Sequence, residues 1–95
     1  MTTTLRIEHT VPDFESWKTM FDNDPLRREA SGVRRYRILR AVDDPRYVMI
    51  DMEFDTRAEA EALLANLRTL WAGPAAAVSS NQRARVTDIV ETREY

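Results

Sequence analysis

Several residue types that carry catalytic chemistry are scarce in this sequence. Its 95 residues include no cysteine, one histidine, two glycines and one lysine. The lack of cysteine excludes disulfide bonds, thiolate catalysis and cysteine-ligated zinc or iron–sulfur centres. His9 alone cannot hold a metal without carboxylate help, and neither HxxxH nor HxH spacing is present. Because glycine-rich phosphate loops and the G-x-S-x-G motif are also absent, we expect no cofactor and no metal.

The sequence also lacks a strong charge of one sign and long hydrophobic runs. The net charge is −2 and the charged residues are interspersed, which argues against a nucleic-acid-binding surface. No apolar run approaches the roughly 20 residues of a membrane-spanning helix. Residues 1–6 contain no apolar signal core. We therefore expect a cytoplasmic protein of one domain, residues 1–95, that binds neither nucleic acid nor membranes.

Hydrophobic periodicity predicts an alternation of strands and helices. A period of two predicts strands over 3–11, 33–42, 46–55 and 82–94. Helical spacing predicts one helix from Asp13 to Asp24, a short helical segment over 25–31 that ends at Gly32, and a long helix between Thr56 and Gly73. We expect residues 74–81 to form a connection with about one helical turn. Asp13 is suited to cap the first helix, and Thr56 with Glu59 matches a capping box.

This order of elements is βαββαβ. It predicts an α+β fold in which a four-stranded antiparallel sheet carries both helices on one face, since both helices then cross between parallel neighbours on the same side. The alternating apolar residues supply the face that packs against the helices, namely Leu5, Ile7, Tyr36, Ile38, Val48, Ile50, Met52 and Phe54.

The opposite face of the sheet is charged. Its residues are Arg6, Glu8, Thr10, Arg35, Arg37, Leu39, Tyr47, Met49, Asp51 and Glu53. If Val42 lies opposite Arg46, then Arg37 opposes Asp51 and Arg35 opposes Glu53, and each such pair stabilises a sheet by about 0.2–1 kcal/mol. Two interpretations remain open: the face is solvated, or it packs against the same face of a second copy and encloses a polar cavity.

Three segments resemble a known superfamily. They are Val11 to Lys18 with Phe21-Asp22, Gly32 to Tyr36, and Asp43-Asp44-Pro45 before a strand. Together they are similar to the ferredoxin-like dimeric α/β barrel superfamily, and most similar to small bacterial proteins beside its antibiotic-biosynthesis monooxygenase-like group. The resemblance implies a homodimer and a ligand cleft between sheet and helices or inside the barrel. The activities it implies range from cofactor-independent oxygenation and cyclisation of aromatic polyketides to haem degradation and ligand binding.

The haem-degrading branch fits this sequence poorly. That branch uses an Asn on the first strand, a Trp on the second helix and a His shortly after it. Trp71 matches the Trp, but the first strand has no Asn and the only histidine lies on that strand. The departure argues against haem degradation.

A few side chains could carry chemistry. His9 is the candidate catalytic residue, as a general base or hydrogen-bond donor, although its parity with Leu5 and Ile7 also fits a buried structural histidine. The candidate ligand-binding residues are Trp17, Tyr36, Tyr47 and Trp71. Core packing is the alternative for both tryptophans. Asp51 and Glu53 share a face, but the arginines opposite would keep both ionised, which favours a structural role.

Two functions follow from the sequence. The first is a cofactor-independent monooxygenase or cyclase acting on an aromatic or polyketide-like small molecule. The second is a non-catalytic small-molecule-binding or assembly module of the same fold. Whether the protein is an enzyme stays open at this point, and a homodimer with a small hydrophobic or aromatic ligand is expected in either case.

Overall fold

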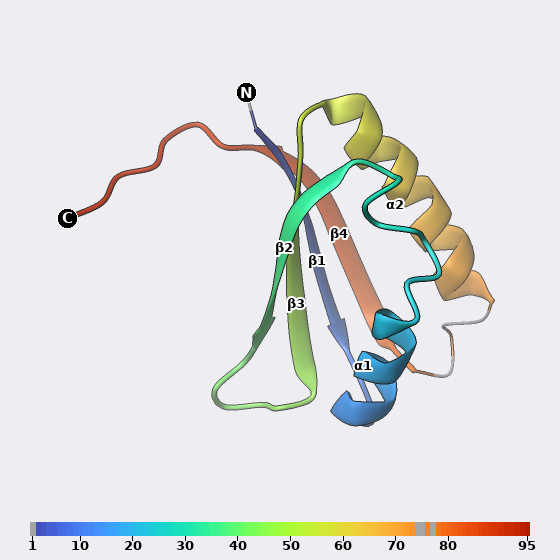
Figure 1. Cartoon of the computed structure of the whole chain (residues 1–95). Coiled ribbons are helices and arrows are strands. Elements are labelled where there is room, and N and C mark those ends of the chain that lie inside the picture. The colour runs from blue at the N-terminus through green and yellow to red at the C-terminus, as the bar shows by residue number, and fades with distance from the viewer. Residues whose placement is uncertain (1, 74–75, 77) are drawn as a thin grey trace.

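The sheet and helices follow the predicted order. The computed structural model describes residues 2–73, 76 and 78–95. The elements are β1 (Thr3–Thr10), α1 (Phe14–Asp22), β2 (Val33–Arg40), β3 (Tyr47–Phe54), α2 (Arg57–Ala72) and β4 (Ser80–Asp88). The strands form one antiparallel sheet in the order β2-β3-β1-β4, and both helices lie on the same side of it (Figure 1). The predicted ferredoxin-like α+β fold is confirmed.

Both helices begin at the predicted caps. The Asp13 carboxylate accepts a hydrogen bond from the Ser16 amide at 3.0 Å. At α2, the Thr56 hydroxyl accepts from the Glu59 amide at 3.2 Å and donates to the Glu59 carboxylate at 2.9 Å. These side chains satisfy amides that the first turn of a helix leaves free, so the start of each helix is set locally.

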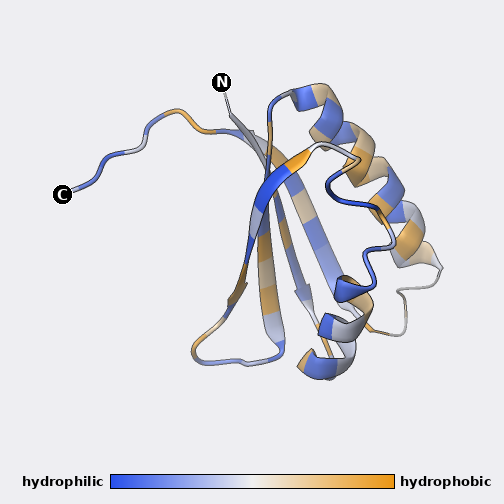
Figure 2. Ribbon diagram, in the orientation of Figure 1, coloured by the Kyte–Doolittle hydropathy of each residue, from blue (hydrophilic) through white to orange (hydrophobic). Residues whose placement is uncertain are grey.

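The core lies between the sheet and the helices. Alternate residues along β3 are buried, and the same alternation of hydrophobic and hydrophilic positions is visible along the strands in Figure 2. The buried apolar residues are Leu5, Ile7, Val11, Trp17, Phe21, Val33, Val48, Ile50, Met52, Phe54, Ala60, Leu63, Leu64 and Leu67. The predicted inner face therefore packs against the apolar sides of both helices.

The predicted register of the β2–β3 hairpin is confirmed. Arg37 lies opposite Asp51, and Arg35 lies opposite Glu53. Opposed charges across the strands favour this register over a slipped one.

The ladder between β1 and β4 is interrupted at His9. Glu8 pairs with Arg83 and Thr10 pairs with Ser80, so β4 has one residue more than β1 at this point. Asn81 in this bulge has a φ of 54°, a conformation that asparagine tolerates better than most residues. The side-chain amide of Gln82 closes the bulge by donating to the backbone oxygen of Ser79 at 3.0 Å.

The prediction of a short helical segment over 25–31 is wrong. These residues form consecutive turns, because Asp24 and Arg27 have positive φ values of 53° and 49° and therefore interrupt any helix. The turns end at Gly32, whose φ of 101° suits glycine, and Val33 donates back to the Arg28 carbonyl at 3.0 Å. Residues 23–32 thus connect α1 to β2 without regular structure.

The last strand is shorter than predicted. β4 ends at Asp88 instead of Glu94, because the final backbone bond to β1 joins the Ile89 amide to the Thr2 carbonyl. Residues 89–95 extend away from the sheet (Figure 1). Of the expected connection over 74–81, residues 74, 75 and 77 lie outside the described residues, and so does the predicted helical turn.

Candidate functional site

A small apolar cavity lies between the sheet and the helices. The sheet contributes its floor through Ile7, His9, Ile50 and Met52, and α1 contributes a wall through Trp17, Met20 and Phe21. The roof comes from Leu67, Leu70 and Trp71 of α2 and from Pro25, Leu26 and Arg28 of the connection after α1. Only His9 and Arg28 among these residues have an ionisable side chain.

Aromatic rings run along one wall of the cavity. The Trp17 ring lies 5.1 Å from the Phe21 ring at an interplanar angle of 28°, and 5.3 Å from the His9 ring. Trp17 and Phe21 lie four residues apart on α1, so the helix places both on its inner side. A flat ligand could stack against such a wall.

His9 provides a polar group inside this apolar site. The side chain is buried, with 2% of its surface exposed, and Nδ1 has no hydrogen-bond partner among the described residues. Burial lowers the pKa of His9 from its ordinary value of 6.5 to about 4, because the charged form loses its hydration, while a weaker interaction with the residue's own backbone partly offsets this. The imidazole is therefore neutral at pH 7 and offers one donor and one acceptor.

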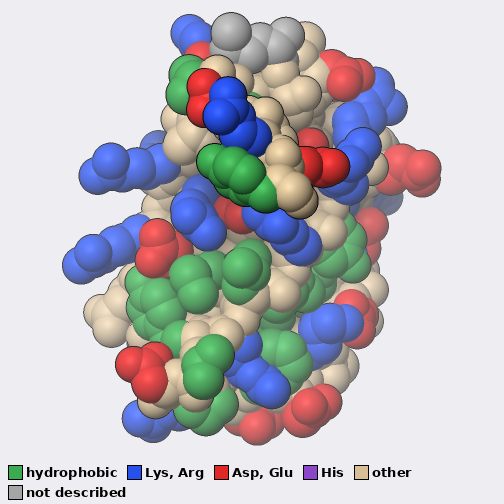
Figure 3. Space-filling model, turned by 90° about the vertical axis from the view of Figure 1, so that its left-hand side faces the viewer, with side chains coloured by type: hydrophobic (Ala, Val, Ile, Leu, Met, Phe, Trp, Pro, Cys, Tyr) green, Lys and Arg blue, Asp and Glu red, His purple; other side chains and the backbone are tan. Residues whose placement is uncertain are grey.

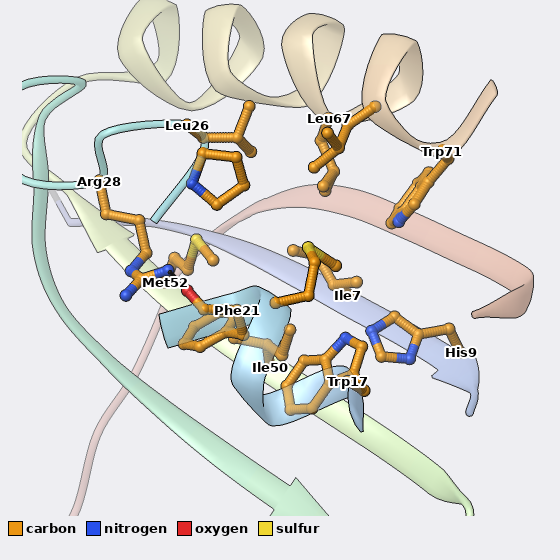
Figure 4. Close-up of a pocket in the computed structure, with 13 residues that line it drawn as sticks. Ile7, His9, Trp17, Phe21, Leu26, Arg28, Ile50, Met52, Leu67 and Trp71 are labelled. Atoms are coloured by element: carbon orange, nitrogen blue, oxygen red, sulfur yellow. Dashed lines mark hydrogen bonds between the residues drawn. The ribbon is translucent and has the colours of Figure 1, made fainter. Parts of the chain in front are cut away.

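Arg28 lies at the other end of the cavity. Figure 4 shows Arg28 and His9 at opposite ends, with Met52 and Ile7 between them. The Arg28 Nη1 donates to the Phe21 carbonyl at 2.7 Å and lies 3.4 Å from the Asp24 carboxylate. The guanidinium also lies 3.9 Å above the centre of the Phe21 ring. These contacts fix the guanidinium at the boundary between α1 and the connection that follows it.

The cavity is too small for an aromatic ligand as it stands. Its volume is about 40 Å³, whereas a cavity that admits benzene measures about 150 Å³. A ligand must therefore enlarge it. Pro25 and Leu26 form the part of the roof that lies outside helices and strands, so this part can move without breaking either.

The structure brings together some of the predicted site residues. His9, Trp17 and Trp71 line the same cavity. Tyr36 does not line it: the residue is 42% exposed, and its ring contacts Phe21 from outside, with 5.2 Å between ring centres. Tyr47 lies on the opposite face of the sheet.

The surroundings of Tyr47 are polar. Its hydroxyl donates to the Glu8 carboxylate at 2.6 Å, and this hydrogen bond is the main reason that the pKa of Tyr47 is raised.

Three residues of the connection after α1 line the cavity although they were not predicted as site residues, namely Pro25, Leu26 and Arg28. They were missed because residues 25–31 were predicted to form a short helical segment. The one signal in the sequence was the spacing of four residues between Asp24 and Arg28, which suits an ion pair that holds the guanidinium.

The sheet face opposite the helices is held by ion pairs. Asp51, whose side chain is 13% exposed, lies 3.1 Å from Arg6 and 3.5 Å from Arg37. The contact with Arg6 lacks the geometry of a hydrogen bond. Figure 3 shows the side of the molecule away from the helices, where basic side chains project and hydrophobic side chains gather towards the end of the β2–β3 hairpin. This face carries a charge lattice and an apolar end.

Across residues 2–73, 76 and 78–95, no group of three or more histidine or acidic side chains is placed to hold a metal ion. No helix in the same part of the chain is long and apolar enough to span a membrane.

Solved structures share this fold along nearly the whole chain. SnoaB, a cofactor-independent oxygenase from Streptomyces nogalater, superimposes with a TM-score of 0.70 at 18% identity, covering 96% of this chain and 95% of SnoaB. A dimeric ferredoxin-like protein from an uncultured marine organism gives 0.72 at 10% identity, covering 99% and 92%. A protein from Mycobacterium tuberculosis gives 0.70 at 13% identity, covering 99% and 100%. No family model and no curated protein matches the sequence.

These similarities concern the fold. They confirm the ferredoxin-like fold that the sequence motifs predicted.

Proposed function

We propose that this protein binds a small aromatic molecule in the cavity between sheet and helices and oxygenates it without a cofactor. The observation that carries the proposal is His9: the only imidazole of the chain lies buried in an apolar cavity, and its Nδ1 has no partner among the described residues. A buried polar atom without a partner costs free energy, so such a group is often kept for a ligand. The fold shared with a cofactor-independent oxygenase supports the same function.

The chemistry needs an acidic C–H bond in the substrate. Loss of that proton leaves a carbanion spread over the aromatic system, and the carbanion can reduce dioxygen itself. A C–O bond then forms to give a hydroperoxide, which loses water to leave a ketone, so a CH₂ group and O₂ become C=O and H₂O. The proposed role of His9 is to accept the proton, because a neutral imidazole has a free lone pair and a developing negative charge beside it raises its pKa.

Oxygen uptake with 1,8-dihydroxy-9-anthrone as probe tests this proposal. We expect uptake by the parent protein and at least a tenfold slower rate for His9→Leu, since general-base catalysis contributes about 10²–10⁴-fold. Arg68→Gln changes an exposed position of α2 and serves as the control with unchanged rate. Absence of uptake by the parent, or equal rates for the parent and His9→Leu, would contradict the proposal.

A non-catalytic binding module is the second candidate. The lowered pKa of His9, about 4, favours it, because an imidazole of that pKa is a weak base at neutral pH. Binding of the anthrone without oxygen uptake would assign this function instead.

We also propose that the protein is a homodimer. Two proteins of the same fold are described as dimeric, and the sheet face opposite the helices has an apolar end that a second copy could cover. Light scattering after size exclusion should give twice the mass of the chain at micromolar concentration. A monomer under these conditions would refute the dimer.

A further inference from the structure

We infer that the ligand of the cavity is an aromatic acid, whose carboxylate is bound by Arg28. The inference rests on the proposed binding site between sheet and helices and adds the chemical class of its ligand. It follows from the polarity of the cavity, the free donors of Arg28 and the position of Asp24.

The cavity has one cationic end. Apart from His9 and Arg28, the side chains that line it are apolar. A carboxylate is costly to bury in such surroundings unless a positive charge lies beside it. Arg28 is the cationic side chain that lines the cavity, and its side chain is only 15% exposed, so its charge is weakly screened by water.

Arg28 has donors to spare. Its contacts with the Phe21 carbonyl and with Asp24 both use Nη1. Among the described residues, its Nε and Nη2 make no hydrogen bond. Stacking on the Phe21 ring, 3.9 Å from the ring centre, holds the guanidinium plane in place. A fixed guanidinium with one free edge is suited to bind a carboxylate through two parallel hydrogen bonds.

Asp24 lies beside the same guanidinium but outside the lining of the cavity, and its carboxylate accepts a hydrogen bond from the Arg28 amide at 2.9 Å. Its carboxylate lies 3.4 Å from Arg28 Nη1, which is longer than a good charge-assisted hydrogen bond. Asp24 and Arg28 both belong to the irregular connection between α1 and β2. A ligand carboxylate that binds Arg28 would therefore compete with Asp24 for the positive charge of the guanidinium.

The two polar ends set the shape of the ligand. An aromatic ring system would lie along Trp17 and Phe21, with its carboxylate at Arg28 and a hydroxyl or carbonyl at His9. A neutral hydrocarbon would leave both Arg28 and the Nδ1 of His9 unpaired, and would bind more weakly for that reason.

Two probes of similar size test the inference. 1-Naphthoate carries the acid, and 1-naphthylmethanol replaces it with a neutral group. Calorimetric titration at neutral pH should show that the parent binds the naphthoate at least tenfold more tightly. Both tryptophans line the cavity, so quenching of their fluorescence locates the bound probe there.

Variants of the arginine and of its partner make the test specific. Arg28→Met should remove the preference for naphthoate and leave binding of the alcohol, whereas Arg28→Lys should keep part of it. Asp24→Asn removes the competing anion and should tighten naphthoate binding severalfold without changing the alcohol. Asparagine tolerates the φ of 53° at this position, so the variant is expected to fold even if Arg28→Met does not. Arg34→Gln, an exposed position outside the cavity, is the control for surface charge.

The outcomes separate this inference from the proposed function. Equal affinity of the parent for both probes, or an unchanged preference in Asp24→Asn, would overturn the aromatic-acid assignment and leave the binding site standing. Failure of both probes to bind would overturn the assignment together with the site. Preference for the naphthoate without oxygen uptake from an anthrone would support the assignment and count against the oxygenase.

Discussion

The neutral, buried state of His9 makes the stability of the protein depend on pH in a defined window. In the folded chain the pKa of His9 is about 4, whereas in the unfolded chain it returns to about 6.5. As the pH falls below 6.5, the unfolded state takes up a proton that the folded state takes up only near pH 4. The folded state therefore loses stability between these two values as the pH falls.

The size of this loss follows from the two pKa values. Linkage gives a difference of about 2 kcal/mol in the free energy of unfolding between about pH 8 and about pH 5. His9→Leu removes the titrating group and keeps a similar volume among apolar neighbours, so the variant should lack this part of the pH dependence. It should also be at least as stable as the parent at high pH, since it removes a buried polar atom that lacks a partner.

Urea denaturation of both proteins across this range measures the effect. Carboxylates titrate in both proteins and cancel in the difference, and no other histidine is present. The reasoning is refuted if the difference in free energy of unfolding between parent and variant stays constant between the two pH values. A constant difference would mean that His9 is charged or hydrated in the folded protein.

Three further predictions concern the fold that carries the site, and urea denaturation tests each of them. Gly32→Ala should destabilise by roughly 1–2 kcal/mol, because Gly32 has a φ of 101° and a Cβ there would lie 2.5 Å from the Glu59 carboxylate; an unchanged stability would show that the turn tolerates other conformations. Asp51→Ala should cost about 1–2 kcal/mol and more than Glu53→Ala, because Asp51 is the more buried and faces two arginines; equal losses would remove the special role of Asp51. Thr56→Ala should cost about 1 kcal/mol, and a loss below a few tenths would mean that the cap at α2 is redundant.

Local chemistry explains why most of the fold could be predicted. Alternation along β3 and the capping box at Thr56 are signals that neighbouring residues define by themselves. The hairpin register also followed from charge pairing. Two predictions of secondary structure were wrong. In residues 25–31 the conformation depends on positive φ values, and at the end of β4 the length of the strand depends on where its partner β1 stops. Neither feature produces a periodic pattern in the sequence.

The candidate site could be predicted only in part. His9, Trp17 and Trp71 were found because strand parity and helical stripes placed them on the inner side of the fold. Arg28 was not found, because a positively charged residue in an irregular connection has no periodicity to show that it reaches the cavity. Tyr36 shares the parity of the core, but it lies on the edge strand β2, where α1 covers it only partly.

The extra residue of β4 opposite His9 shifts the alternation of inward and outward side chains along that strand by one position. Before it, Ser79 is directed to the buried side, and after it Ala84 is directed to the same side. Shortening the chain by one residue at position 81 or 82 would leave a continuous ladder in which Ser80 still lies opposite Thr10 and Ser79 stays on the buried side. The one residue that remains of the two would then lie directly opposite His9 and be directed to the same side as the histidine. Insertions and deletions at these two positions therefore offer evolution, or an engineer, a means of changing what surrounds His9 while the rest of the sheet keeps its pairing.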